Sequence, residues 1–445
     1  MKMLTISLLV VAVLIVGTAF AETDVERENV QLKERVDRLE GDVSQLKGML
    51  EQKPKAPAEA EKPAMRAKYG VDLYGFIKLD LAYMDSRAND SGNYARWIES
   101  EEVNENDNQF NVTARESRFG FMLQGPQLAS MKTSGRMEMD FYEGGAENKN
   151  RPMMRHAYLQ VEWPNSGWSI LAGQTGDLMS PISPETLNYS VGWWIGNIGY
   201  RRPQLRVSKS FDVGKDVQVL AQVAAARTIG HFGPFSPSQD AGKDSGFPTV
   251  MARYAVTFPL FNGKKTTLGV SGHWGEEEYD TDARGNHTHM RSWSADLDIL
   301  LPVSDWLNFK AEFWAGENLD QYLGGVGQGV VIETAESPFV FVNGENVKGA
   351  FIRQWTVASM GGWASMVLGP WDGWRFGAGY SVDNPDDKDV PTQGRTWNDS
   401  YWTQISYDLN EAVRVGVEIS WWETQYKDLE DGNALRMQTS LVYRF

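Results

Sequence analysis

The residues best suited to bind a ligand are arginines and lysines that recur at alternate positions along many segments. A guanidinium group stays charged at neutral pH, and its N–H donors match the two oxygens of a carboxylate. Such residues on one surface predict electrostatic recognition of small anions. The basic candidates are Lys78, Arg118, Arg136, Arg202, Arg206, Arg253, Arg375, Arg414 and Arg436.

Four arginines are the strongest candidates, because they flank the early alternating segments and the end of the long segment 174–199. They are Arg118, Arg136, Arg202 and Arg206. Glu138 and Asp140 share their parity and are candidate lining residues of the same surface. The alternative is that the arginines only pair with these and other acids, which would leave little selectivity.

Catalytic and metal-binding motifs are weak. His287 and His289 near Asp280 could hold a metal ion, but two histidines with this spacing are common by chance. Ser271-Gly272-His273 is a local run whose neighbouring residues face opposite ways in a strand. We therefore predict no enzymatic activity, no metal site and no cofactor. The absence of Cys also excludes Cys nucleophiles, Cys-ligated zinc and disulfide scaffolds.

The overall composition excludes further classes. The formal net charge of −16 argues against nucleic acid as a partner. The mean hydropathy of −0.42 excludes a polytopic helical membrane protein, which needs several apolar runs. Aromatic residues make up 12% of the chain and Gly numbers 43. This combination suits a soluble β protein or an outer-membrane β-barrel.

The N-terminal region divides into three expected segments. Residues 1–21 have the form of a signal peptide, with a transmembrane anchor as the alternative. Residues 22–50 carry heptads typical of a coiled coil, or of a helix packed on its own domain. Residues 51–67 are a Pro-rich linker, and residues 68–445 form the main domain. The predicted coiled-coil interface is Val25, Asn29, Leu32, Val36, Leu39, Val43, Leu46 and Leu50.

Apolar and polar residues alternate along the main domain. Around residue 138, Met137 and Met139 fall on one face, whereas Glu138 and Asp140 fall on the other. Successive side chains of a strand point to opposite faces. Each such segment is therefore predicted to be a strand with one apolar and one charged face.

Sixteen strands can be placed in this way. They are 69–83, 110–124, 131–142, 153–163, 168–173, 200–209, 216–226, 248–258, 265–274, 289–301, 306–316, 353–368, 374–382, 396–409, 413–424 and 433–445. The seven short and eight long intervals between them alternate strictly. This alternation is typical of transmembrane barrels and is not expected in a soluble β-sandwich. We predict an all-β fold, a 16-stranded antiparallel transmembrane β-barrel with an N-terminal coiled-coil helix.

Tryptophans cluster beside the predicted short turns, at Trp163, Trp168, Trp306, Trp371 and Trp374. Indole prefers a boundary between membrane and water, so this clustering favours the barrel over ordinary core packing.

Acidic residues concentrate in two of the predicted long loops, 84–109 and 275–288. Such loops could bind divalent ions that bridge to lipopolysaccharide phosphates, or repel anions at the mouth. The simpler expectation is that these acids are only solvated.

The C-terminal residues Leu441, Tyr443 and Phe445 alternate and resemble the signature by which assembly machinery reads outer-membrane barrels. Other supporting motifs are Tyr74-Gly75-Phe76-Ile77-Lys78-Leu79-Asp80, Ala114-Arg115-Glu116-Ser117-Arg118-Phe119-Gly120-Phe121, Arg155-His156-Ala157-Tyr158-Leu159 and Ala172-Gly173-Gln174. Taken in order with the leader, heptads and linker, these motifs make the whole chain resemble the DcaP-like trimeric porins.

The resemblance implies a homotrimer in the outer membrane of a Gram-negative bacterium, with the stalk in the periplasm. It implies passive diffusion of small hydrophilic solutes, with a leaning to small organic anions such as dicarboxylates. It also implies that the third loop, 174–199, folds into the lumen. The expected partners are membrane lipid, lipopolysaccharide, the assembly machinery and peptidoglycan. Val at a and Leu at d of the heptads favours two strands, so we expect the barrel to set the oligomer number.

Two other functions remain open. A sugar-specific channel of the sucrose-porin type would need an aromatic slide, for which the candidates are Tyr74, Phe76, Trp314, Trp402 and Trp422. A structural envelope protein would instead use the stalk to link the outer membrane to peptidoglycan.

Overall fold

The computed structural model describes most of the chain after residue 68. The described residues are 33, 38, 40–41, 69–90, 95–103, 107–128, 130–143, 149–179, 181–189, 192–232, 235, 240–282, 284–336, 340–341 and 349–445. Contacts divide the chain into two units, Met1–Arg66 and Ala67–Phe445. The predicted signal peptide and linker lie outside the described residues. So does the heptad interface of Val25, Asn29, Leu32, Val36, Leu39, Val43, Leu46 and Leu50.

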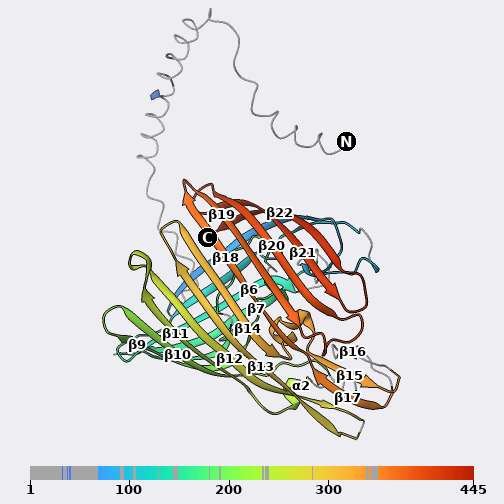
Figure 1. The fold of residues 1–445 in the computed structure, drawn as a ribbon. Helices are drawn as coiled ribbons and strands as arrows, with labels where there is room; N and C mark the ends of the chain where they lie inside the picture. Colours follow the sequence, from blue (N-terminus) through green and yellow to red (C-terminus); the bar gives the residue numbers. More distant parts are fainter. Residues whose placement is uncertain are drawn as a thin grey trace, which may run out of the picture. The chain divides into compact units, whose positions relative to one another are not determined.

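Within the described residues, the second unit is a closed barrel of sixteen antiparallel strands, which confirms the predicted fold class (Figure 1). The first eight are β1 (Gly70–Met84), β4 (Gln109–Thr113) continued by β5 (Arg118–Gln124), β6 (Lys132–Glu143), β7 (Arg151–Trp163), β8 (Trp168–Gly176), β9 (Arg201–Val213), β10 (Val217–Ala226) and β11 (Thr249–Pro259). The other eight are β12 (Lys265–Asp280), β13 (His287–Pro302), β14 (Leu307–Glu317), β18 (Ala358–Trp371), β19 (Trp374–Pro385), β20 (Arg395–Asp408), β21 (Val413–Tyr426) and β22 (Gly432–Arg444).

The barrel closes where its first and last strands meet. β1 pairs with β22, from Phe76 opposite Arg444 to Met84 opposite Arg436. Beyond the Phe76–Arg444 pair, Phe445 and Gly75 exchange two backbone hydrogen bonds of 3.1 Å. Closure pairs the edge strands that an open sheet would leave free.

Side chains alternate along the strands as the sequence predicts. Apolar side chains lie on the outer face of the barrel, and polar side chains lie on the inner face. Ile77 is 59% exposed on the outer face, whereas its neighbour Lys78 is 5% exposed inside. Along β6, Met137 is exposed and Glu138 is buried. This arrangement inverts that of a globular domain and suits an apolar surrounding.

Three predicted boundaries differ from the structure. The segment 110–124 is two strands separated at 114–117, because the chain bends where it leaves the pairing of β4 with β1. The segment 353–368 begins outside the barrel, as β17 (Phe351–Thr356) in a small sheet with β15 (Val330–Thr334) and β16 (Val340–Phe341). The expected loop 275–288 is mostly strand, because cross-strand pairs continue to Asp280 opposite His287. Oppositely charged pairs such as Glu276 opposite Arg291 stabilise a ladder.

The remaining described elements are short and lie in the long loops or turns. They are β2 (Ala88–Asp90), β3 (Ala95–Ile98), α2 (Ala241–Asp244) and 3-10 turns at Phe261–Gly263, Asp320–Tyr322 and Gly325–Gly327. Among the residues that the structure describes, no helix is long and apolar enough to cross a membrane.

Loops fill part of the barrel interior and bury apolar side chains there. Ile195 of the loop 177–200 packs with Ile98 of β3 and with the inward tryptophans Trp402 and Trp422. A second cluster joins the same loop to Trp314 of β14. Aromatic residues also line the outer face beside the short turns, as predicted. Those exposed are Trp168, Trp306, Trp371 and Trp374, and Trp163 pairs with Trp168.

Candidate functional site

The loop 177–200, which joins β8 to β9, crosses the interior and is held by distant strands. The carboxylate of Glu418 on β21 accepts backbone N–H groups from Leu187 at 2.6 Å and from the next residue at 3.2 Å. Glu312 on β14 accepts the N–H of Ile182 at 3.0 Å. Buried backbone donors need acceptors, so these two acids fix the path of the loop.

Other side chains hold carbonyl groups of the same loop. Gln438 on β22 and Lys78 on β1 donate to the carbonyl of Leu187 at 3.0 and 2.6 Å. Gln404 on β20 donates to the carbonyl of Glu185 at 2.6 Å. We call the polar set that holds the loop the anchor wall, which comprises Glu312, Gln404, Glu418 and Gln438.

A second group of charges lies on β5, β6 and β7. Glu138 accepts from Arg136 at 2.6 Å and from Arg155 at 2.8 Å, and Arg118 lies 3.7 Å away. Arg155 also pairs with Asp140 at 2.7 Å. Three guanidinium groups therefore share two carboxylates, which leaves one positive charge. We call this set the arginine wall, which comprises Arg118, Arg136, Arg155, Glu138 and Asp140.

The arginine wall contacts the loop through one tyrosine. Arg155 donates to the hydroxyl of Tyr189, and the guanidinium carbons of Arg118 and Arg155 lie 5.9 and 5.7 Å from its ring centroid. The side chains of Arg136 and Arg118 stay 30% and 19% exposed. The charges on this side of the loop are therefore only partly covered.

Two predicted arginines have a different environment. Arg202 is fully buried, 2.9 Å from Asp177 and with its guanidinium 4.0 Å from the ring centroid of Tyr322. Arg253 is buried against Asp298 at 2.7 Å. These two ion pairs hold loops and strands together, and neither guanidinium is presented to a solute.

Arg206 and Arg436 are inward but bonded to neutral groups. Arg206 donates to the side chain of Gln204 at 2.9 and 3.1 Å and to the carbonyl of Gly176. Arg436 donates to Gln438 at 3.1 Å. These bonds hold the two guanidinium groups against neighbouring groups of the inner face.

A small cavity lies below the loop, toward the short turns. Arg375 and Arg414 both pair with Asp408, at 3.3 and 2.5 Å. The cavity holds about 160 Å³, and its charged lining residues are Lys78, Glu116, Glu185, Arg375, Arg414 and Arg444. Bases outnumber acids there, as they do on the arginine wall.

Sequence reasoning missed Arg155 because of a β-bulge. Strict alternation along β7 places Arg155 on the apolar outer face. The register shifts between the pairs Glu138–His156 and Met139–Met154, so Arg155 is an extra residue without a direct partner. A bulge re-aims a side chain, and here it turns the guanidinium inward. An arginine in the apolar parity was the sequence sign of this bulge.

The aromatic candidates for a sugar path are mostly covered. Trp314, Trp402 and Trp422 are buried under loops, and Trp314 donates to the carbonyl of Gly196 at 2.7 Å. Tyr74 donates to Glu138 at 2.9 Å and so belongs with the charged groups.

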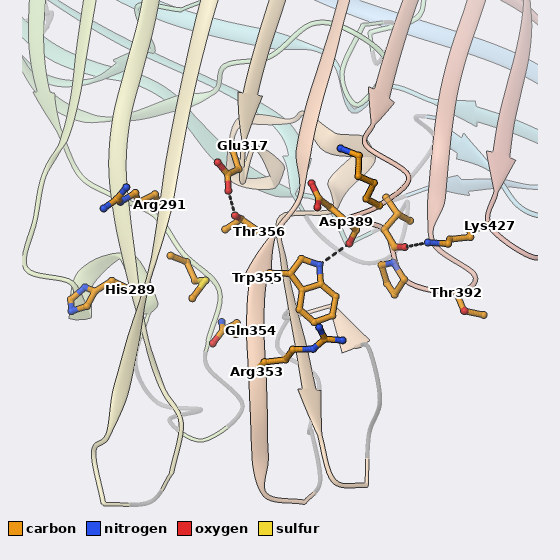
Figure 2. Close-up of a pocket in the computed structure, with 14 residues that line it drawn as sticks. His289, Arg291, Glu317, Arg353, Gln354, Trp355, Thr356, Asp389, Thr392 and Lys427 are labelled. Carbon is orange, nitrogen blue, oxygen red and sulfur yellow. Dashed lines mark hydrogen bonds between the residues drawn. The ribbon is translucent and has the colours of Figure 1, made fainter.

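A groove of about 830 Å³ lies at the loop rim, between β13, β17 and the loop 386–394 (Figure 2). Arg353 stacks on Trp355 at 4.9 Å, and Trp355 donates to the carbonyl of Asp389 at 2.8 Å. Arg291 lines the groove from β13. The pattern of alternation gave no sign of this groove, because β17 and the loop come from separate parts of the rim.

No protein-family model matches this sequence, and no curated protein matches it. Solved structures do match. The outer membrane channel DcaP of Acinetobacter baumannii has 19% identity and a TM-score of 0.64, covering 85% of this chain and 99% of that one. A Salmonella typhi OmpF complex with daunomycin has 13% identity and a TM-score of 0.55, covering 85% and 98%.

Likeness at these identities concerns the fold. It confirms, at that level, the resemblance read from the motifs of the sequence. This chain, a closed sixteen-stranded barrel with an inward-folded loop, has a fold similar to that of the outer membrane channel DcaP.

Proposed function

We propose that this protein is a passive channel of the outer membrane and that it has no enzymatic activity. The proposal is supported by the fold shared with a protein described as an outer membrane channel. It is also supported by the apolar outer face, the tryptophans beside the short turns and the polar interior. Small hydrophilic solutes would cross without a cofactor.

The proposed preference is for small organic anions such as dicarboxylates. The observation that carries this proposal is the surplus positive charge of the arginine wall, with Arg118 and Arg136 partly exposed. The acids of the anchor wall are bonded to backbone N–H groups of the loop, so they attract cations less. We infer that solutes pass between the loop 177–200 and the arginine wall and then meet the bases of the turn-side cavity.

The test is the reversal potential across a planar bilayer that separates two salt concentrations. The wild type should favour anions, and the double variant Arg118→Gln/Arg136→Gln should lose most of that preference. Lys215→Gln removes an exposed base from a short turn and serves as the matched control. Cation preference in the wild type would refute the proposal, as would equal anion preference in the double variant.

A sugar-specific channel predicts a different result in liposome swelling. Dicarboxylates should enter faster than disaccharides of similar size if the arginine wall sets selectivity. Faster entry of the sugar would favour the alternative, although three of its five aromatic candidates are buried.

We further propose a homotrimer whose stalk extends into the periplasm toward peptidoglycan. The heptads are the sequence feature that favours association. Conductance should rise in three coupled steps per inserted unit, and single independent steps would contradict a trimer of open channels.

Leu441, Tyr443 and Phe445, which are exposed on the outer face of β22 and at its end, are proposed as the signal for the assembly machinery. Deletion of Phe445 should lower the amount of folded barrel in the membrane.

The rim groove that contains Arg291 and Arg353 is proposed as a contact for lipopolysaccharide phosphates. Lipopolysaccharide should copurify less with Arg291→Gln/Arg353→Gln than with wild type.

A further inference from the structure

Four potential metal ligands share one face of the hairpin formed by β12 and β13. Glu278 lies directly opposite His289 in the strand register, and Glu276 and His287 are two residues away along each strand. All four side chains have the parity of Trp274 and Trp293, which are exposed on the outer side of the barrel. The strand pairing thus assembles a group that sequence spacing alone did not predict.

The distances within this group suit one ion. One donor atom from each of Glu278, His287 and His289 lies within 4.8 Å of the others. The Nε2 atom of His289 is 3.7 Å from Glu278. The Nδ1 atom of His287 is 3.6 Å from Glu278 and 3.2 Å from the carbonyl oxygen of Gly285, a contact that a bound ion would replace. Ligands of a tetrahedral zinc ion, with bonds of about 2.0–2.1 Å, lie roughly 3.3 Å apart. Small side-chain adjustments would therefore close the site.

Glu276 orients one of the ligands. Its carboxylate lies 2.6 Å from the Nδ1 atom of His289, which leaves Nε2 of that ring directed toward Glu278. A carboxylate bonded to the far nitrogen of a ligating histidine fixes the ring and makes it a better donor. Glu276 is therefore a positioning residue for the site.

The tip of the hairpin is closed and holds the strands in register. Thr281 donates its N–H to the carbonyl of Asn286 at 2.6 Å. Asp282 accepts from the N–H groups of Arg284 and Asn286 at 2.8 and 3.2 Å, and from the side-chain amide of Asn286 at 2.6 Å. Asp282 therefore builds the turn, and His287 follows it at a fixed place.

We propose that Glu278, His287 and His289 bind a first-row transition-metal cation of the zinc class, with Glu276 orienting His289. Imidazole ligands suit zinc, copper and nickel, whereas calcium and magnesium prefer oxygen alone. Three protein ligands leave a coordination position for water. The ion links β12 to β13 beyond the tryptophans of the outer face and steadies this part of the rim.

The experiment measures zinc binding to the full chain in detergent, after chelator treatment and without added histidine tags. Wild type should bind one zinc ion per chain that His287→Gln/His289→Gln does not bind. Glu276→Gln should keep this stoichiometry but bind about tenfold more weakly. His231→Gln, a histidine variant elsewhere on the rim, should bind zinc as wild type does.

Cobalt supplies an independent readout. Cobalt added in place of zinc should give the visible absorption of a four-coordinate ion in wild type and lose it in the double histidine variant. Heat-modifiable gel migration checks that every variant is a folded barrel. Equal zinc binding by wild type and the folded double variant would overturn the proposal, and so would an absence of zinc binding by wild type.

Discussion

On β5, β6 and β7, three guanidinium groups share two carboxylates, whereas on β14, β20, β21 and β22 the polar side chains hold backbone groups of the loop 177–200. Both walls contain buried acids inside one barrel. They differ in what neutralises the charges. Acids of the anchor wall accept N–H groups, whereas the acids of the arginine wall are shared by three guanidinium groups.

This difference explains why counting charges on the inner face is a poor guide to selectivity. Glu418 counts as a lumen acid by parity, yet its oxygens are directed at two loop amides. Arg202 counts as a lumen base, yet it is sealed against Asp177. A charge acts most strongly on a solute when no nearby opposite charge offsets it and when no other group covers it.

Removing Arg155 should have the largest effect of all, on the folding free energy of the barrel. Arg155→Gln leaves Glu138 and Asp140 buried without their shared partner, which costs about 3–5 kcal/mol of folding free energy. Urea unfolding of the barrel in lipid vesicles measures this loss. Arg227→Gln is the matched control, because its exposed pair with Asp240 is worth about 0–1 kcal/mol. Equal losses in the two variants would show that the arginine wall is not a buried network.

Removing an anchor should have the next largest effect, and a local one. Glu418→Ala deprives Leu187 and its neighbour of their acceptor, at a cost of about 1–3 kcal/mol confined to the loop. Hydrogen exchange of residues 181–189 should accelerate, and channel current should become noisier. Glu411→Ala, on an exposed short turn, should change neither quantity. Unchanged exchange in Glu418→Ala would mean that the loop path does not depend on the anchor wall.

The contact between the arginine wall and the loop can be loosened more gently. Tyr189→Phe removes the hydroxyl that accepts from Arg155, while Arg155 keeps both of its carboxylates. We expect a loss of about 1 kcal/mol and a small rise in anion conductance, because the loop tip moves more freely. Conductance and urea unfolding measure these changes. A loss as large as that of Arg155→Gln would show that the tyrosine, and not the carboxylates, holds the wall together.

A titratable contact at the rim should give the smallest effect, because it is a single, partly exposed pair. Burial lowers the pKa of His231, but the hydrogen bond and charge of Asp320 at 2.9 Å, with Glu277 and Asp240 nearby, raise that pKa overall. A raised pKa means that the contact stabilises fully below the unfolded value of about 6.5 and is lost as pH rises through the folded pKa.

Hydrogen exchange of residues 227–232, corrected for intrinsic rates, should therefore show less protection as pH rises through that range. His231→Gln should abolish this pH dependence. Persistence of the dependence in the variant would assign it to another group.

Much of the barrel could be predicted from the sequence because strand geometry is local. Alternation of side chains in the sequence determined which face of each strand is apolar, and Ile77 and Lys78 follow it in the structure. Interval lengths determined the number and order of strands. Alternation also predicts that Arg136 and Glu138 share one face of their strand, and in the structure they form an ion pair.

Only the tertiary structure decided which of those charges meet, because that depends on contacts between distant segments. A single extra residue in β7 turned Arg155 inward, whereas strict alternation places this residue on the outer face. The anchoring of Leu187 by Glu418 joins residues far apart in the chain. The strand register likewise placed His289 against Glu278, a residue that the sequence predicted to lie in a loop. The sequence alone determined the strands of the barrel, because alternation is a property of neighbouring residues. The arrangement of the interior was decided by the path of the loops across the barrel.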